Sequence, residues 1–205
     1  MNLTNMLISV CIFIMAVAVH EVAHGWTAFR YGDSTASDAG RLTFNPLVHL
    51  DLVGSFILPL ALILLGVPAL GWAKPVPVNF NNLNHPKKDM ILVALAGPIV
   101  NIIMAILFSI PIRLNFFDEY SFLGKLCFNG IIINLILAIF NMIPVPPLDG
   151  SRIVTGLLPW KYVFRYNKLE PYGFIILLIM LWGGLLQNVI LPFVGSLVSI
   201  LIGVK

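Results

Sequence analysis

Three long stretches of this sequence are nearly free of charged residues, and they restrict the fold more than any other feature. The stretch from about residue 3 to residue 30 carries Glu21 as its one charge before the terminal arginine. The stretch from about 90 to 112 carries none, and that from about 122 to 143 carries Lys125 alone. An apolar helix of about 20 residues crosses the ~30 Å hydrocarbon core of a bilayer. Each stretch is therefore predicted to be a membrane-spanning helix.

Composition places the whole chain in the same class. Only 10% of the 205 residues are charged and 59% are hydrophobic, whereas a soluble domain has about 25% charged residues. We therefore expect residues 1–205 to form a single integral-membrane domain. The net charge of +3 comes from 12 Lys and Arg against 9 Asp and Glu, which does not indicate nucleic acid as a partner. The expected fold class is an all-α polytopic membrane protein, and its expected surroundings are the lipid bilayer.

Two further apolar stretches are less regular. Residues 52–71 contain several glycines and prolines that interrupt a helix. Residues 172–203 are too long for one comfortable span and are broken by polar residues and a proline. The expected total is about five to six membrane segments, with one or two of them in 172–203. Residues 31–49, 72–89 and 151–171 are predicted to be polar or basic loops.

The distribution of Lys and Arg favours one topology. If residues 52–71 crossed the membrane, the loops on the two sides would hold four and seven of these residues. If the same stretch dips in and returns, nine fall on one side, and Arg113 and Lys125 fall on the other. The nine are Arg30, Arg41, Lys74, Lys87, Lys88, Arg152, Lys161, Arg165 and Lys168. Because positive loops face the cytoplasm, we predict a re-entrant 52–71 segment in the cell membrane, an N-terminus outside and cytoplasmic basic loops. A distorted true span is the alternative.

The sequence HEVAH places three ionisable residues, His20, Glu21 and His24, inside the first apolar stretch. Ionisable groups at membrane depth are costly and usually functional. Histidines four residues apart lie on one helix face and can bind one zinc ion. The glutamate beside them can act as general base toward a metal-activated water. The alternative is a chance match to a short motif, with histidines that only bond a neighbouring helix.

A catalytic zinc ion usually takes three protein ligands, so a third is required. The candidates are His49, Asp51, His85 and Asp149, and Asp149 is favoured. It lies in NMIPVPPLDG, where prolines end a helix and Gly150 permits an unusual turn, so the carboxylate can be fixed at the mouth of a membrane helix. The re-entrant topology also puts it on the same side as the two histidines. A turn cap is its alternative role. For His49, a role as a partner of the site and a role as an interfacial histidine are equally expected. His85 is expected to be solvated.

Four asparagines in the second and third long apolar stretches are candidates for roles at or near the site. Asn141 is eight residues before Asp149, on what we expect to be the same helix. Its amide could bind a scissile carbonyl or the developing oxyanion. For Asn129 and Asn134, an interhelical hydrogen bond is the favoured role. Asn101, which follows AGP, either braces the site or caps a kink.

Three motifs together resemble the site-2 protease family of intramembrane zinc metalloproteases: HEVAH, ALAGPIVN at 94–101 and NMIPVPPLDG at 141–150, in the family's order. The stretches GRLTFNPLVHLD and GWAKPVPVN resemble its compact prokaryotic branch, without a PDZ insertion or a nucleotide-sensing domain. The resemblance implies one Zn2+ per chain. It further implies roles for five residues: zinc ligation by His20, His24 and Asp149, general-base catalysis by Glu21, and binding of substrate or intermediate by Asn141.

The expected function is hydrolysis of peptide bonds in or near transmembrane segments of a membrane-protein substrate, at an active site that opens toward the cytoplasm. A substrate helix must unwind first, and we expect residues 52–71 and the loop beside them to receive it as an added β-strand. Two other classes remain. A metal-ion or proton transporter also uses intramembrane His, Glu and Asp, but it typically has paired repeats, which the sequence lacks. A catalytically silent scaffold of the same fold would not need the intact Glu21.

Overall fold

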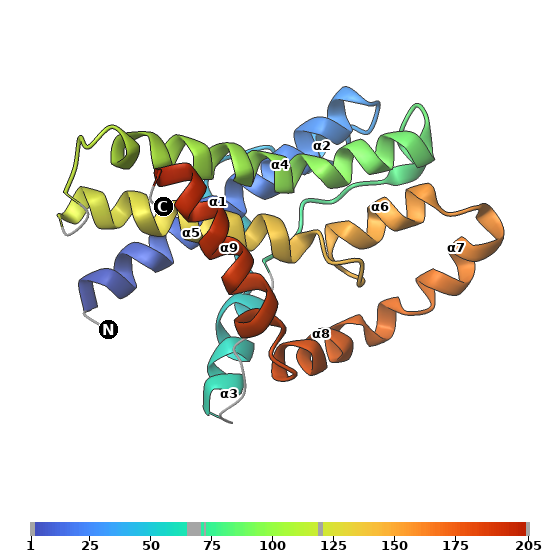
Figure 1. The fold of residues 1–205 in the computed structure, drawn as a ribbon. Coiled ribbons are helices and arrows are strands. Elements are labelled where there is room, and N and C mark those ends of the chain that lie inside the picture. Colours follow the sequence, from blue (N-terminus) through green and yellow to red (C-terminus); the bar gives the residue numbers. More distant parts are fainter. Residues whose placement is uncertain (1–2, 65–70, 72, 119–120, 204–205) are drawn as a thin grey trace.

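The computed structural model describes residues 3–64, 71, 73–118 and 121–203, and over these residues it contains helices but no strand. Three long helices pack against one another and form the body of the molecule (Figure 1). They are α1 (Leu3–Arg30), α4 (Pro86–Arg113) and α5 (Phe122–Asn141). Each is long and apolar enough to cross a membrane. The predicted all-α membrane fold is confirmed.

The ends of the long helices follow from local sequence. Helix α1 ends just before Gly32, which takes a φ of 108°, a conformation that favours glycine. Helix α4 begins with Pro86, whose missing N–H is not needed in a first helical turn. The Asp89 carboxylate accepts a hydrogen bond from the His85 N–H at 2.6 Å and fixes this start. Helix α4 therefore begins inside the stretch predicted to be a loop.

The chain between α1 and α4 leaves and returns at one end of this body. The N–H of Asn84 donates to the Tyr31 carbonyl at 2.8 Å, and the N–H of Lys74 donates to the His49 carbonyl at 2.8 Å. The second bond joins the segments on either side of the predicted re-entrant stretch, so this stretch does not connect opposite ends of the long helices. Its residues 65–70 lie outside the described residues, and its passage through a membrane stays a prediction.

Short helices occupy this connection. They are α2 (Thr35–Asp38), the 3-10 helices η1 (Pro46–His49) and η3 (Phe80–Asn82), the π-helical turn η2 (Val53–Ile57) and α3 (Leu58–Leu64). Helix α3 projects away from the three long helices (Figure 1). Because residues 53–64 are helical, the expectation that they present an edge for an added β-strand is wrong for this part of the stretch.

After α5 the chain forms further helices where a basic loop was predicted over 151–171. They are α6 (Asp149–Leu157), α7 (Trp160–Asn167) and η4 (Glu170–Tyr172), and the apolar stretch that follows forms α8 (Gly173–Trp182), η5 (Leu186–Ile190) and α9 (Leu191–Ile202). The loop prediction is wrong because charge was weighed above the spacing of apolar residues. In α7, Val163 is buried while Lys161 and Arg165 are exposed, as on an amphipathic helix.

By length and composition, the described residues offer three membrane crossings. A fourth is possible if the pair Trp160–Trp182 and Leu186–Ile202, bent by 63°, counts as one. Helices α3, α8 and α9 have 7, 10 and 12 residues, fewer than the about 20 that a crossing needs. The predicted total of five to six membrane segments therefore stays a prediction.

Two buried apolar clusters hold the elements together. One joins α4 and α5 to η5 and α9, and it consists of Ala105, Ile131, Leu135, Ile190, Val194 and Val198. The other joins the end of α1 to the start of α4, and it consists of Ala28, Leu83, Met90 and Val93. The HEVAH histidines lie on α1 just before this second cluster.

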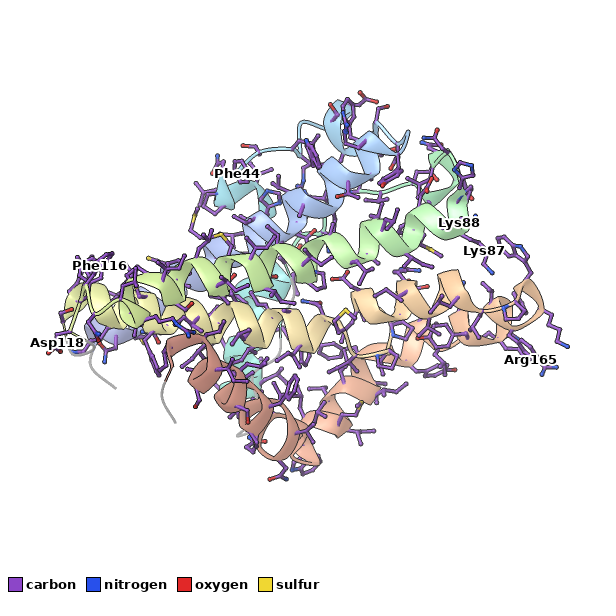
Figure 2. The ribbon with its side chains drawn as sticks, turned by 45° about the horizontal axis from the view of Figure 1, so that its top comes forward. Phe44, Lys87, Lys88, Phe116, Asp118 and Arg165 are labelled. Atoms are coloured by element: carbon purple, nitrogen blue, oxygen red, sulfur yellow. The ribbon has the colours of Figure 1, made fainter. Side chains whose placement is uncertain are left out.

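Charge is distributed unequally between the two ends of the molecule. Figure 2 shows Lys87, Lys88 and Arg165 at one end and Phe116 and Asp118 at the other. Both lysines open α4, and Arg165 belongs to α7, so segments far apart in the sequence bring positive charge to the same end. These are three of the nine basic residues that the predicted topology puts on one side of the membrane, and the topology itself stays a prediction.

Candidate metal centre

The structure brings His20, His24 and Asp149 together where α1, α4 and α6 meet. The Nε2 atoms of the two histidines lie 3.0 Å apart. Asp149 Oδ2 lies 3.1 Å from His20 Nε2 and 3.2 Å from His24 Nε2. Both histidines are buried, with 6% and 8% of their surface exposed. The three residues predicted to bind one ion therefore present one compact triangle of ligand atoms.

The other nitrogen of each imidazole ring is bonded to an oxygen that can only accept. His20 Nδ1 lies 2.6 Å from Asn101 Oδ1, and His24 Nδ1 lies 2.7 Å from the Val93 carbonyl oxygen. Each Nδ1 must therefore carry the proton, which leaves a lone pair on Nε2 of the neutral ring. Two nitrogen lone pairs and one carboxylate oxygen then face the same point.

This set of atoms fits a metal ion. Three acceptors at such short separations repel one another unless a cation lies among them. Asp149 Oδ2 is buried and accepts no hydrogen bond within the described part of the chain, and a buried polar atom in that position normally has a partner. Two imidazole nitrogens and one carboxylate oxygen form a ligand set typical of catalytic zinc, which keeps a further position open.

Asp149 reaches the histidines because α6 starts close to the end of α5. Residues 142–148 form the turn between them, so the prediction that Asn141 and Asp149 share a helix is wrong: the prolines end α5 first. Gly150 lies inside α6 and has no positive φ, so the expectation that Gly150 permits an unusual turn is also wrong. A Cβ at Gly150 would lie 2.6 Å from the Ile143 carbonyl oxygen. Glycine is required there for close approach.

Helix α4 supplies space as well as hydrogen-bond partners. A Cβ at Gly97 would lie 2.6 Å from His20 Nε2 and closer still to His24 Nε2. Sequence reasoning assigned no role to Gly97 or to the Val93 carbonyl. The signal for Gly97 was its place in the AGP motif, whereas a backbone carbonyl leaves no signal in a sequence.

Glu21 contacts a different part of the chain. Its Oε2 accepts a hydrogen bond from the N–H of Val76 at 2.8 Å. Val76 belongs to residues 73–79, an irregular segment that we call the strap. The carboxylate predicted to be the base is thus oriented by a backbone N–H that no sequence pattern had indicated.

Arg41 fixes one end of the strap. Its Nη2 donates to the carbonyls of Lys74 and Pro75 at 2.9 and 3.3 Å. The guanidinium is buried, with 8% of the residue exposed. A charged donor on two consecutive carbonyls holds the backbone just before the residue that bonds Glu21.

Asp33 fixes the other end. Its carboxylate is fully buried and accepts hydrogen bonds from the Asn79 N–H at 2.7 Å, from the Thr35 hydroxyl at 2.5 Å and from the Asn82 amide at 3.0 Å. Burial alone would raise the pKa of Asp33, but these hydrogen bonds outweigh it and hold the pKa below its ordinary value of 3.8.

The remaining candidate ligands do not join the cluster. His49 is buried, and its Nε2 bonds the Thr43 carbonyl at 2.8 Å. Asp51 accepts a hydrogen bond from the Gly54 N–H at 2.7 Å and so caps the helical turn that follows. The side chain of His85 is 76% exposed, as expected for a solvated residue.

The asparagines divide into two pairs. Asn101 braces His20, and Asn134 bonds Asn101 across two helices at 2.8 Å, as predicted for an interhelical contact. Asn129 instead donates to the carbonyl four residues earlier in its own helix, at 3.0 Å. Asn141 does the same at 3.0 Å. The predicted role of Asn141 toward substrate therefore stays a prediction.

Known proteins resemble this chain over most of its length. Residues 118–184 match the model of peptidase family M50, a range that holds Asn141 and Asp149 but not the two histidines. "Putative zinc metalloprotease YwhC" of Bacillus subtilis (strain 168) is 35% identical over 190 residues, which cover 89% of this chain and 84% of that relative.

Two other relatives are matched by this chain over only part of their length. Rip2 of Mycolicibacterium smegmatis, named in the same way, is 29% identical over 82% of this chain, which spans 64% of Rip2. "Zinc metalloprotease MJ0392" of Methanocaldococcus jannaschii is 28% identical over 91% of this chain, which spans 46% of that relative. No solved structure gives a significant match.

Proposed function

Because this chain belongs to peptidase family M50 and is a zinc metalloprotease, we propose that it hydrolyses peptide bonds in or near transmembrane segments of membrane proteins. One observation carries the proposal. The convergent ligand atoms of His20, His24 and Asp149 include two on a 28-residue helix that is long and apolar enough to cross a membrane. A metal site on such a helix acts on bonds that lie at membrane depth.

The proposed zinc site consists of His20 Nε2, His24 Nε2 and Asp149 Oδ2. Zinc, when bound, supplies the Lewis acidity that polarises a peptide carbonyl and acidifies water. The chain fixes the rotation of both imidazoles and directs their Nε2 atoms toward the ion, because Asn101 and the Val93 carbonyl accept the Nδ1 protons. The buried Asp149 carboxylate completes the site with a negative charge.

Glu21 is the proposed general base. Its carboxylate takes one proton from the attacking water, whose hydroxyl adds to the carbonyl carbon, and it passes the proton to the amine as the C–N bond breaks. General acid–base catalysis of this kind contributes about 10²- to 10⁴-fold. The Val76 N–H orients one carboxylate oxygen. Asn141, at the end of α5, is the proposed donor to the substrate carbonyl or to the developing oxyanion.

The proposed orientation puts the site near the cytoplasmic surface. His20 is ten residues before Arg30, which is about 15 Å along a helix. Lys87, Lys88 and Arg165 gather at one end of the molecule (Figure 2), and the positive-inside rule assigns such an end to the cytoplasm. The N-terminus then lies outside, and water enters from the basic side.

The proposed substrate is a membrane segment that unwinds before it is cut. A helix hides its peptide bonds in its own hydrogen bonds, so residues near the cleaved bond must leave the helical conformation. Glycine or proline near that bond lowers the cost of unwinding by about 1 to 3 kcal/mol per residue. Substrate segments that contain such residues are therefore expected to be cut faster.

Cleavage of a labelled transmembrane substrate by the purified protein tests the proposed activity. Wild type and Glu21→Gln should both contain one zinc ion per chain, and only wild type should cleave. Asp51→Asn is the matched control, because it alters a carboxylate that caps a helical turn outside the cluster, and it should cleave normally. Bound zinc without Glu21-dependent cleavage of any tested substrate would refute the proposed mechanism.

Cysteine labelling tests the proposed topology. Ser37→Cys and Asn81→Cys, both at exposed positions, are introduced separately into a chain whose native cysteines are replaced by serine. A membrane-impermeant thiol reagent should reach both positions from the cytoplasmic side only. Labelling of the two positions from opposite sides would contradict the re-entrant passage of residues 52–71.

A further inference from the structure

Asn101 is buried at the meeting point of three helices. It lies on α4 and is 0% exposed. Its Oδ1 is 2.6 Å from His20 Nδ1 on α1, and its Nδ2 donates to the Ala16 carbonyl at 3.3 Å. The same Nδ2 donates to Asn134 Oδ1 on α5 at 2.8 Å. Asn134 is 1% exposed and donates in turn to the Gly130 carbonyl at 2.8 Å.

These bonds have one consistent direction. The Gly130 carbonyl can only accept, so Asn134 presents its amide nitrogen to α5 and its oxygen to Asn101. Asn101 must then present its nitrogen to Asn134 and its oxygen to His20. The Ala16 carbonyl, which also only accepts, fixes the same orientation of Asn101. A backbone carbonyl of α5 therefore determines which nitrogen of His20 holds the proton, through two side-chain amides.

We propose that Asn101 is a positioning residue of the zinc site and that Asn134 is the anchor that holds its amide in place. The inference rests on the proposed zinc site at His20, His24 and Asp149. A ligand ring held in one tautomer and one rotation binds zinc more tightly, because less order is lost on binding and the ring is more basic. Asn101 acts through His20 and touches no reacting atom.

The two histidines depend on different kinds of partner. His24 donates to the backbone carbonyl of Val93, which no side-chain substitution removes. His20 donates to a side chain, and that side chain depends on a second one. Loss of Asn101 should therefore leave one of the three ligands, His20, without a fixed orientation. Zinc should still bind, but with lower affinity.

Three substitutions and one control test this inference in the full chain. Asn101→Leu keeps the volume and removes the acceptor for His20. Asn101→Asp restores an acceptor oxygen, and Asn134→Leu removes only the anchor. Asn129→Leu is the control, because Asn129 lies on the same helix as Asn134 but bonds only the carbonyl of Lys125, according to the described contacts. Zinc affinity is measured by competition with a chelator, and the d–d absorption spectrum of bound Co2+ reports the geometry of the site.

Asn101→Leu should weaken zinc binding by about 10- to 100-fold, the range found for such supporting partners, and should change the Co2+ spectrum. Asn134→Leu should weaken it less, Asn101→Asp should recover part of the affinity and the wild-type spectrum, and Asn129→Leu should match wild type. Equal affinity and equal spectra in wild type, Asn101→Leu and Asn134→Leu would overturn the positioning role while the zinc site stands. A wild-type chain that binds no zinc would overturn the proposed site itself, and this inference with it.

Discussion

Two faces of helix α1 serve the same site but have different supports. On one face, His20 and His24 are bonded to helix α4 and lie beside Asp149 of helix α6. On the other, Glu21 is bonded to the N–H of Val76 in the strap, which has no regular structure. The metal ligands are thus held by packed helices, and the base is held by an irregular segment.

The difference implies that substitutions can impair the two faces separately. Helix packing fixes the ligand triangle through residues that are buried and tightly bonded. The described hydrogen bonds hold the strap at separate points, through Arg41 and the His49 carbonyl before Val76 and through Asp33 after it. Changes on the histidine face should lower zinc affinity and activity together, whereas changes in the strap should lower activity and leave zinc affinity unchanged.

Outside the proposed ligands and base, the largest effect is expected from Gly97→Ala on the histidine face. The added Cβ would lie 2.6 Å from His20 Nε2, and each ring is held from its other side by Asn101 or Val93, so the rings must leave their positions. Zinc affinity should fall by about 100-fold, the upper end of the range for a disturbed ligand, and cleavage should fall with it. Gly195→Ala is the control, since its Cβ would meet nothing within 4 Å. Normal zinc affinity in Gly97→Ala would contradict the described packing.

A smaller effect, on the other face, is expected from Val76→Pro. Proline lacks the N–H that bonds Glu21, and a hydrogen bond to a charged group contributes about 1.5 to 3 kcal/mol. The cleavage rate should fall by about 10- to 100-fold, and zinc affinity should not change. Val76→Ala keeps the N–H and should retain most of the activity. Equal rates in the proline and alanine variants would show that the Val76 N–H does not orient the base.

Arg41→Ala should have a milder effect through the same segment. It removes the charged donor to the Lys74 and Pro75 carbonyls. Each such hydrogen bond contributes about 1.5 to 3 kcal/mol, but only part of this loss reaches Glu21, because Arg41 acts through the strap backbone. We expect a rate about 3- to 10-fold lower and faster limited proteolysis within the strap, with unchanged zinc affinity. Arg30→Ala removes the same charge at an exposed position and should leave both properties intact. If the two arginine variants behave alike, the hydrogen bonds of Arg41 do not fix the strap.

The smallest effect on cleavage is expected from Asp33→Asn, which acts mainly on stability. The pKa of Asp33 is lower in the folded chain than its ordinary value of 3.8. Its charged form therefore stabilises the fold above pH 3.8, and this contribution is lost as the pH falls from 3.8 through the lowered value. Thermal unfolding at pH 7 and pH 3 should show a larger loss for wild type than for Asp33→Asn. An equal loss in both would contradict this role of Asp33.

The sequence predicts the histidine face well because that face uses periodic structure. The HEVAH spacing places both rings on one side of a helix, and hydropathy predicts the bounds of that helix, which the structure gives as Leu3–Arg30. Asp149 is the one acidic residue beside a proline-ended apolar stretch. Its convergence with the histidines is therefore expected, even though it lies far along the chain.

The contact that holds Glu21 could not be predicted from the sequence, for a physical reason. The partner of Glu21 is a backbone N–H 55 residues away, and every residue except proline has such a group. The strap has no periodic pattern that would place it over α1. Helices α6 and α7 were not predicted for another reason. Their charged residues are typical of a loop unless the spacing of their apolar residues is considered.

The most direct test of the central claim is the zinc content of three purified chains. If His20, His24 and Asp149 hold the metal and Glu21 does not, wild type and Glu21→Gln should each contain one zinc ion per chain. Asp149→Ala, purified in the same way, should contain almost none. A full complement of zinc in Asp149→Ala, or loss of zinc in Glu21→Gln, would contradict the separation of the two faces.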